Sequence, residues 1–429
     1  MTTGEGDTRI PAGDARLTEL ARRFGTPAYV YDLGRLAPAV VSLTTALPGG
    51  ARLLYSLKAN PHPALVGRLG ELGVHAEVSS EGELRTALSA GRQTDQILYT
   101  GPGKTAGEVR TALAAGIRLF SVESLTDRGR LAEQCAQLGV DTRYLVRLNG
   151  PRGSTRGSLR MTGRPSAFGV DTADVDALAE LLRPLGRARP VGTHTFAATN
   201  IDDPHALLAE FALAVDSTAE AVGRAGFVPE ILDLGGGFPA PSGRPGDIPR
   251  HPRLARGLAH ALDARFPGWR AGRPRILFEA GRSLVATAGT LLTTVLDVKR
   301  SGGRTFTVLD AGVNVLGGMS GLGRLLAPGI QPYALDEPAP AAGEPEPGRA
   351  GTLVGPLCTP LDVLSGSAAL EDPYPGQLIA VPNVGAYGLT ASLLGFLSRP
   401  LPVEVVVEDD RVLSARRLVL QPMELTPRD

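Results

Sequence analysis

From about residue 50 onward, short β-type runs alternate with longer helical patterns, and this alternation limits the possible folds more than any other feature. The longer segments carry Leu and Ala at three- and four-residue spacing, which is typical of helices; they lie at 63–72, 82–90, 105–115, 124–138, 175–185 and 204–225. Strands are expected at 52–57, 74–78, 96–99, 118–122, 142–148, 190–196, 231–234 and 275–278. Eight strand–helix units of about 20–40 residues predict a (β/α)8 barrel rather than an open doubly wound sheet.

The pattern changes after residue 283. Runs separated by turns, without long helices, predict an all-β module of the sandwich or Greek-key type, with strands at 295–298, 305–309, 351–354, 378–381, 403–407 and 417–420. A run at 28–32 precedes the barrel and is expected to complete this module. We therefore predict an N-terminal tail and strand at 1–34, a barrel at 35–283 and a C-terminal β domain at 284–429. Disorder is expected at 1–14 and in the Pro-, Ala- and Glu-rich stretch 335–348.

Composition excludes several classes of protein. The net charge is zero and 43% of the residues are hydrophobic, so nothing points to a nucleic-acid or membrane partner. The two cysteines, Cys135 and Cys358, are far apart and form neither a metal-binding spacing nor a disulfide framework. No metal site is expected, and a cytoplasmic location fits the absence of an apparent signal peptide.

Lysine is rare, with only Lys58, Lys104 and Lys299 against 41 arginines. Lys58 stands at the end of the first predicted barrel strand. Arginine can replace lysine as a charge but not as an amine nucleophile, because the guanidinium stays protonated. Lys58 is therefore a candidate for a Schiff base with an aldehyde such as pyridoxal phosphate (PLP). The alternative is a lysine that extends from a strand end into water. Lys104 is expected to be a charged loop residue near the barrel mouth and Lys299 a surface residue.

Polar residues gather at the predicted carboxyl ends of the strands, where barrels of this kind place their active sites. In chain order they are Lys58, Glu77, Thr100, Glu123, Arg147, the stretch 194–199, the glycines 235–237, and Glu279 with Arg282. This set supplies an amine, an acid for a pyridine nitrogen, and a glycine loop with an arginine for a phosphate. Each part alone has a plainer interpretation, such as a turn, a helix cap or a solvated charge.

Seven motifs together resemble the fold-type III PLP-dependent decarboxylases of diaminopimelate, ornithine and arginine. They occur in that family's order at 55–61 (YSLKANP), 76–84 (AEVSSEGEL), 100–104 (TGPGK), 232–238 (LDLGGGF), 279–282 (EAGR), 355–358 (GPLC, with Asp362) and 385–388 (GAYG). The resemblance extends over roughly residues 25 to 425. It implies a PLP-binding barrel and a homodimer with shared active sites.

The resemblance also implies roles for individual residues. Lys58 would hold PLP as a Schiff base, Glu279 would pair with its pyridinium nitrogen, and Cys358 of the partner subunit would protonate the carbanion. The other cofactor-binding residues would be Glu77, Arg147, His194, Phe196, Thr199, Gly235, Gly236, Gly237, Gly281, Arg282 and Tyr387. Asp362 and Thr359 would face the substrate. On the residues alone, Cys358 could equally be a small buried hydrophobe and Asp362 a loop cap.

Departures from the family pattern bear on the substrate. Phe196 stands where many members place a histidine that stacks on PLP, and Ala198 replaces a glycine. Diaminopimelate decarboxylases carry a Glu at the position of Thr359 and an Arg-Pro near Gly318. The loss of both charges argues against free diaminopimelate. These departures resemble a natural-product subgroup, some of whose members act on amino acids held as carrier-protein thioesters.

We therefore expect PLP-dependent α-decarboxylation of an L-amino acid, free or bound to a carrier protein, in specialised metabolism. The alternatives are diaminopimelate decarboxylase of lysine biosynthesis, a catalytically silent PLP-binding homologue and, less well matched by the lysine motif, a racemase. The Arg- and Gly-rich stretch 151–165 is expected to be a lid over the site or an inert loop.

Overall fold

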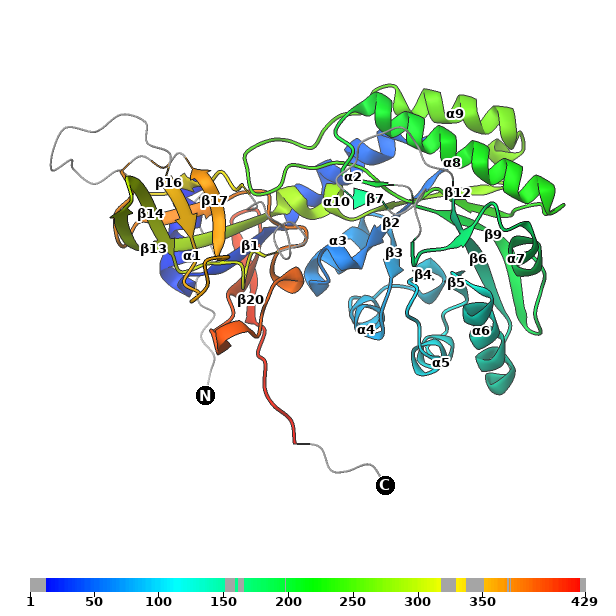
Figure 1. Cartoon of the computed structure of the whole chain (residues 1–429), viewed down its shortest axis with the longest axis horizontal. Coiled ribbons are helices and arrows are strands. Elements are labelled where there is room, and N and C mark those ends of the chain that lie inside the picture. Colours follow the sequence, from blue (N-terminus) through cyan, green and yellow to red (C-terminus); the bar gives the residue numbers. More distant parts are fainter. Residues whose placement is uncertain are drawn as a thin grey trace. The chain divides into compact units, whose positions relative to one another are not determined.

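The computed structural model describes residues 13–150, 159–160, 166–196, 198–317, 329–336, 351–368, 370 and 372–424. Gly318, nearly all of the expected lid at 151–165 and most of the expected disordered stretches at 1–14 and 335–348 lie outside this part. By its internal contacts the chain forms two compact units (Figure 1). One contains Leu36–Ala240 and Asp247–Val285; the other contains the chain up to Arg35, the segment Pro241–Gly246 and everything from Ala286 onward.

The first unit is a closed barrel of eight parallel strands, which confirms the predicted fold class. The barrel closes where β12 pairs with β2, with Leu277 opposite Arg52 and Ala280 opposite Tyr55. The strands are β2 (Arg52–Ser56), β3 (His75–Val78), β4 (Ile97–Tyr99), β5 (Leu119–Val122), β6 (Thr142–Asn149), β9 (Ala188–Thr195), β11 (Ile231–Asp233) and β12 (Arg275–Ala280). All eight lie within two residues of their predicted bounds, because their apolar runs fill a common buried interior.

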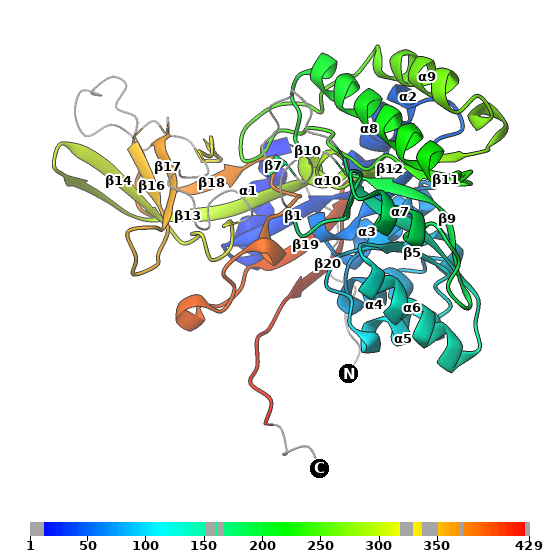
Figure 2. The same cartoon turned by 45° about the vertical axis from the view of Figure 1, so that its right-hand side comes forward.

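Helices surround the barrel and begin at residues that cap them. Ser80, Thr105 and Ser124 accept hydrogen bonds from the first turns of α4, α5 and α6. Helices α8 and α9 run side by side (Figure 2), and Gly257 of α9 admits Leu208 of α8 at close range. The helices are α2 (Leu36–Ala46), α3 (Pro63–Glu71), α4 (Glu81–Ser89), α5 (Ala106–Ala114), α6 (Leu125–Leu138), α7 (Val175–Leu181), α8 (Pro204–Arg224), α9 (Leu254–Arg265) and α10 (Arg282–Val285). Helices α2 and α9 were not predicted.

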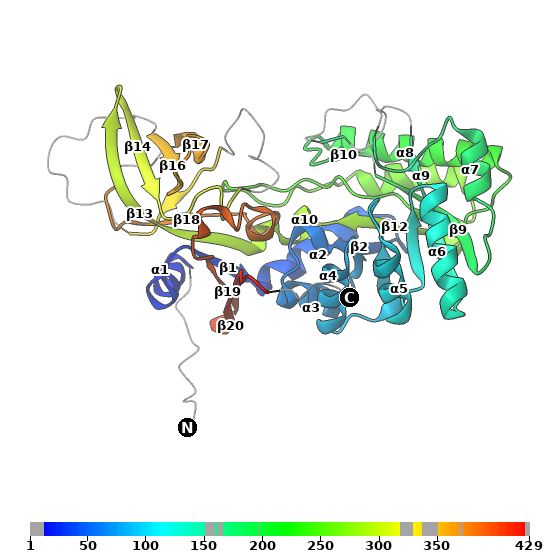
Figure 3. The same cartoon turned by 60° about the horizontal axis from the view of Figure 1, so that its bottom comes forward.

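The second unit is a mixed sheet built on a long hairpin of β13 and β14 (Figure 3). As expected, β1 joins this sheet: it pairs antiparallel with β13 and parallel with β19. Helix α1 (Gly13–Phe24) packs its apolar face on the sheet, so residues 13 and 14 are helical rather than disordered. The strands are β1 (Ala28–Asp32), β13 (Gly289–Ser301), β14 (Arg304–Leu309), β15 (Tyr333–Ala334), β16 (Gly351–Val354), β17 (Val363–Ala368), β18 (Leu378–Val381), β19 (Val403–Glu408) and β20 (Arg411–Arg417).

The strand expected at 417–420 is wrong. The last strand, β20, ends at Arg417 because that residue pairs with Val403, the first residue of β19, and no partner strand continues beyond it. Strand β17 was missed because its sequence, VLSGSA, lacks a clear apolar alternation. None of the described helices is long and apolar enough to cross a membrane.

Lys104 lies in the loop after β4, as expected, and its side chain is buried. Its side chain is 2% exposed and its Nζ lies 2.7 Å from a carboxylate oxygen of Asp127, which is 4% exposed. Nζ also donates to the backbone carbonyls of Gly101 and Ser121. The lysine therefore ties the loop that follows β4 to strand β5 and to helix α6, beside the C-terminal mouth of the barrel.

We expect Lys104→Met to lower the free energy of unfolding by about 3 kcal/mol, because it leaves the buried carboxylate of Asp127 without its lysine, and Arg130, at 3.5 Å, is then its one ion-pair partner among the described residues. Lys299→Met is the matched control, since Lys299 is 63% exposed and should change stability by less than about 0.5 kcal/mol. Urea unfolding followed by circular dichroism measures both. Equal stabilities of the two variants would contradict a structural role for Lys104.

Candidate active site

Lys58 stands in a short turn, Leu57–Ala59, that directly follows β2. Its Nζ donates to both oxygens of Glu77, at 3.2 and 3.4 Å, and lies 5.6 Å from the ring centroid of Phe196. Glu77 is almost completely buried, whereas 41% of the lysine side chain is accessible. The carboxylate of Glu77 therefore holds the amine in place, while part of the lysine side chain stays accessible to a ligand.

Glu77 is held ionised by its neighbours. Burial alone would raise its pKa, but the charge of Lys58 and hydrogen bonds from Thr100, Ser56 and Lys58 outweigh burial and leave the pKa below its usual value. Ser79 Oγ also donates to Glu77, at 3.0 Å. The ionised carboxylate keeps the lysine at the C-terminal mouth of the barrel.

Phe196 lies against the glycine loop that follows β11. A Cβ added to Gly235 would come 3.0 Å from the Phe196 ring, and one added to Gly236 would come 3.2 Å from it. Gly235 also has φ +70°, a left-handed conformation that favours glycine. The aromatic ring and the two glycines therefore form one flat, closely packed wall of the site.

Three buried ionisable side chains meet beside this wall: His194, Asp233 and Glu279. His194 Nδ1 is hydrogen-bonded to Ser121 Oγ at 2.8 Å, and its Nε2 lies 3.3 Å from Glu279 Oε1. Asp233 accepts a hydrogen bond from the backbone N–H of Gly235 at 2.9 Å. One further atom on each, namely His194 Nε2, Asp233 Oδ2 and Glu279 Oε1, has no hydrogen-bond partner among the described residues.

Burial shifts the pKa of each member of this trio toward the neutral form. Burial, and then the carboxylates of Glu77 and Asp233, raise the pKa of Glu279 well above its usual range. Burial raises the pKa of Asp233 to about 7. Burial, and then Arg147 and Lys58, lower the pKa of His194 well below its usual value, so its ring is neutral. His194 thus adds no positive charge to the trio, and a cation placed beside Glu279 would lower the pKa of that carboxyl.

These features fit PLP. A protonated ring nitrogen placed at Glu279 would supply both such a positive charge and a donor for an unpartnered buried oxygen. The ligand atoms of the trio lie within 4.8 Å of one another, which would also suit a metal ion. However, the amine of Lys58, the aromatic wall and the glycine loop match an organic, phosphate-bearing aldehyde better than a bare cation. Bound PLP would act as an electron sink.

The predicted phosphate-binding residues lie on several elements. Gly235 and Gly236 follow β11, Arg282 opens the short helix α10, and Thr199 belongs to the two-residue strand β10 (Ala198–Thr199).

Gly281 precedes α10, where a Cβ would come 2.9 Å from that of Ala59, so a larger residue would push against the lysine turn. Gly237 belongs to the loop after β11 that also contains Gly235 and Gly236. Tyr387 lies in the other unit, half-buried and with φ +54°.

Arg147 forms a buried ion pair at the end of β6. Its guanidinium lies 2.8 Å from Glu123, whose other oxygen accepts the backbone N–H of Gly169 at 2.7 Å. The guanidinium also stacks 4.8 Å from the ring centroid of Phe168. Arg147 therefore contributes positive potential near the trio while its own charge is balanced by Glu123.

Cys358 and Asp362 lie on one loop of the β unit. Cys358 is exposed and Thr359 half-buried, but Asp362 is only 2% exposed. One Asp362 oxygen accepts the N–H of Val313 and the other accepts the N–H of Leu357, both at 2.7 Å. Both oxygens thus organise the loop, which favours the loop-cap alternative over direct contact with substrate.

Sequence reasoning assigned no role to three residues that complete the site: Asp233, Ser121 and Glu83. Burial, and then the charge of Glu77, raise the pKa of Glu83 to about 7, and its carboxylate accepts the N–H of Ser79 at 2.7 Å. The signal for Asp233 was available, because it is a charge inside the apolar run Ile231–Leu234. Glu83 and Ser121 gave no such signal, since helix starts and strands commonly carry these residues.

The fold and the site together define a PLP-dependent barrel enzyme, and known proteins agree. Residues 33–286 match the family model of the pyridoxal-dependent decarboxylases, pyridoxal binding domain. The chain is 31% identical over 396 residues to an L-glutamyl-[BtrI acyl-carrier protein] decarboxylase from Niallia circulans, with 91% of each chain covered. It is 32% identical over 405 residues to diaminopimelate decarboxylase from Aquifex aeolicus, covering 94% of this chain and 91% of the relative.

A solved structure also resembles this chain over most of its length. Diaminopimelate decarboxylase from Helicobacter pylori, complexed with L-lysine, superposes with a TM-score of 0.78 at 27% identity, covering 94% of this chain and 97% of that one. The chain therefore belongs to the pyridoxal-dependent decarboxylase family, as the seven motifs indicated. It is a PLP-dependent carboxy-lyase.

Proposed function

We propose that this protein removes the free α-carboxylate, as CO2, from an L-amino acid whose side-chain carboxyl is held as a thioester on an acyl-carrier protein. One observation carries the choice of substrate: the Cys358 loop offers no free carboxylate. Thr359 is uncharged, and both oxygens of Asp362 are taken by backbone N–H groups. A substrate with a second free ammonium group would therefore find no uncommitted carboxylate on this loop.

Diaminopimelate is such a substrate, because it has two amino-acid centres. Leaving a charged group without its hydrogen-bond partners weakens transition-state binding by several kcal/mol. Sequence identity does not separate the two candidates, since the carrier-protein decarboxylase is 31% identical and the Aquifex aeolicus diaminopimelate decarboxylase 32%. The chemistry of the loop is therefore the better guide.

Each residue of the barrel site receives a role under this proposal. Lys58 binds the cofactor aldehyde, and Glu77 holds the lysine at the strand ends. Glu279 keeps the ring nitrogen protonated, with His194 positioned beside it by Ser121. Phe196 covers one face of the ring, and the glycines 235–237 with Thr199 and Arg282 bind the phosphate.

Catalysis further requires a proton donor at the reacting carbon, and we propose Cys358 for it. Cys358 belongs to the β unit rather than to a barrel strand, and its side chain is exposed. We infer a symmetric homodimer in which each subunit supplies Cys358 to the barrel of its partner.

Steady-state kinetics on a panel of substrates tests the choice of substrate. We expect kcat/KM for an acyl-carrier protein loaded with an L-amino acid such as L-glutamate to exceed that for free diaminopimelate by at least about 100-fold. CO2 release is measured for both, with the unloaded carrier protein as blank. If diaminopimelate proves the best substrate, the protein is a diaminopimelate decarboxylase and the argument from Thr359 fails.

A pair of variants checks the reason for this preference. Thr359→Glu restores an acid at the loop and should raise kcat/KM for free diaminopimelate by at least about tenfold. Thr359→Gln has nearly the same size and no charge, and should give no such gain. Equal effects of the two substitutions would mean that shape rather than charge governs selection at this position.

A further inference from the structure

The N-terminal mouth of the barrel, opposite the lysine site, concentrates positive charge. Arg52 and Arg275 are the first residues of β2 and β12, and Arg143 is the second residue of β6. Lys58 and Glu279 lie at the other ends of β2 and β12. Glu279 is four positions beyond Arg275, which corresponds to about 13 Å along a strand. The arginines are thus remote from the cofactor residues.

These three arginines line one small cavity of about 40 Å³. A buried water needs about 10–15 Å³ of such volume, so the cavity could hold about three. Its apolar floor is the bottom of the barrel core, formed by Leu54, Leu98, Leu119, Ile231 and Leu277. The space admits a small oxyanion, and its lining includes both the three arginines and these apolar side chains.

The arginines have no acidic partners of their own. None of the three takes part in an ion pair within the described residues. Two nearby acids are already used: Asp141 pairs with Arg187 at 2.9 Å and Glu230 with Arg189 at 2.5 Å. Of the residues that line the cavity, Asp95 is the single acid. Glu230 also acts on Arg143 and Arg275, but its charge is balanced by its ion pair with Arg189, so an excess of two positive charges remains.

The arginines around the cavity lower the pKa values of the basic groups beside them. Burial, and then Arg52 and Arg143, lower the pKa of Arg275. Burial, and then Arg52 and Arg92, lower the pKa of His75, which also lines the cavity, so His75 is neutral at pH 7 and adds no charge. Glu230 offsets part of this effect on Arg275, but the three guanidinium groups still repel one another, and a bound anion would reduce this repulsion.

We propose that the N-terminal mouth of the barrel binds a phosphate-type oxyanion through Arg52, Arg143 and Arg275. Guanidinium groups match the oxygens of a phosphate in bidentate geometry, and a dianion balances the excess of two positive charges. The ligand is either inorganic phosphate or the phosphoryl group of a small phosphate ester. Neither is required for decarboxylation, so this site is separate from the proposed function.

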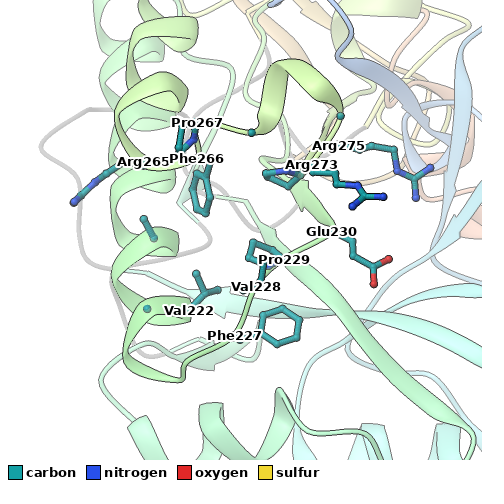
Figure 4. A pocket seen from close by; sticks show the side chains of 15 residues that line it. Val222, Phe227, Val228, Pro229, Glu230, Arg265, Phe266, Pro267, Arg273 and Arg275 are labelled. Carbon is teal, nitrogen blue, oxygen red and sulfur yellow. The ribbon is translucent and has the colours of Figure 1, made fainter.

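A second cavity makes the ester a real alternative. It has a volume of about 920 Å³ and shares Arg275 with the smaller one. Figure 4 shows Arg273 and Arg275 on one side of it, with Phe266, Val222 and Phe227 around its apolar part. The volume is within the range that holds small organic ligands. An ester could therefore place its phosphoryl group on the arginines and its organic part here.

Calorimetric titration of the holoenzyme tests the proposal. The protein carries one equivalent of PLP, so that the cofactor's own phosphate site is occupied, and it is titrated with inorganic phosphate and, separately, with phenyl phosphate at constant ionic strength. We expect saturable binding of one phosphate per subunit. Arg143→Gln/Arg275→Gln should weaken it by at least about tenfold. Arg270→Gln is the matched control, because Arg270 is exposed and paired with Asp263 at 2.8 Å, and it should bind like the parent.

The remaining outcomes are also decisive. Phenyl phosphate binding at least tenfold more tightly than phosphate, with the gain lost in Phe266→Ala, identifies an ester as the ligand; equal affinities identify the free ion. If the double variant does not fold, the exposed Arg52→Gln takes its place and should weaken binding severalfold. No saturable binding by the parent, or binding that is unchanged in the arginine variants, overturns the proposal.

Discussion

Replacement of Lys58 by arginine is expected to remove the yellow colour of the purified enzyme and its decarboxylase activity together. Arginine can preserve the ion pair with Glu77, which Lys58 makes at 3.2 Å, but its protonated guanidinium cannot form a Schiff base with the PLP aldehyde. Since the reaction depends on that bond, kcat should fall by at least about four orders of magnitude. Absorption spectra and CO2 release measure the two losses.

Lysine 299 provides the control for this prediction. It is 63% exposed, and Lys299→Arg should keep both colour and activity. Borohydride reduction of the parent enzyme, followed by peptide mapping, should find the pyridoxyl adduct on the peptide that contains Lys58. An adduct at Lys104 or Lys299, or a coloured and active Lys58→Arg enzyme, would refute the assignment.

Two inactive variants are expected to restore activity to each other when their subunits mix. Lys58→Ala removes the amine and Cys358→Ala the proposed proton donor. If each active site takes Lys58 from one subunit and Cys358 from the other, a mixed dimer has one intact site and one that lacks both residues. Random exchange makes half of the dimers mixed, so about a quarter of the sites regain activity. The rise over either parent should be several hundredfold.

Subunit exchange must be demonstrated independently, for example by resonance energy transfer between labelled subunits. The control mixes Lys58→Ala with a Lys58→Ala/Cys358→Ala double variant, which can form no intact site. A mixture that stays inactive despite proven exchange would show that Cys358 does not act across a subunit interface. The barrel assignments and the phosphate-type anion site would be unaffected by that result.

Much of this molecule could be predicted from its sequence, because its barrel strands are short apolar runs that end in polar residues. Lys58, Glu77 and Glu279 each follow or close such a run, and the structure places all three at one mouth of the barrel. Parallel strands bring their carboxyl ends together whatever the intervening loops do. The position of these residues was therefore readable without any knowledge of contacts.

Other features depended on contacts between distant residues, which the pattern along the chain does not contain. Lys104 and Asp127 are 23 residues apart, and only the fold shows that both are buried and paired. The two oxygens of Asp362 could be assigned only once Val313 was seen beside Leu357. The strand expected at 417–420 failed for a similar reason, since its apolar residues have no partner strand.

The close packing around Asp362 has a practical consequence for protein engineering. A Cβ on Gly312 would come 2.5 Å from an Asp362 oxygen, and one on Gly355 would collide with the same carboxylate. Positions 312, 355 and 362 can therefore change only in concert, and random libraries that include them will consist mainly of misfolded loops. The Thr359 hydroxyl makes a longer contact, accepting the N–H of Leu361 at 3.3 Å, and the residue is half-buried. A programme to redirect this enzyme to new amino acids should diversify position 359 and leave the two glycines and the aspartate untouched.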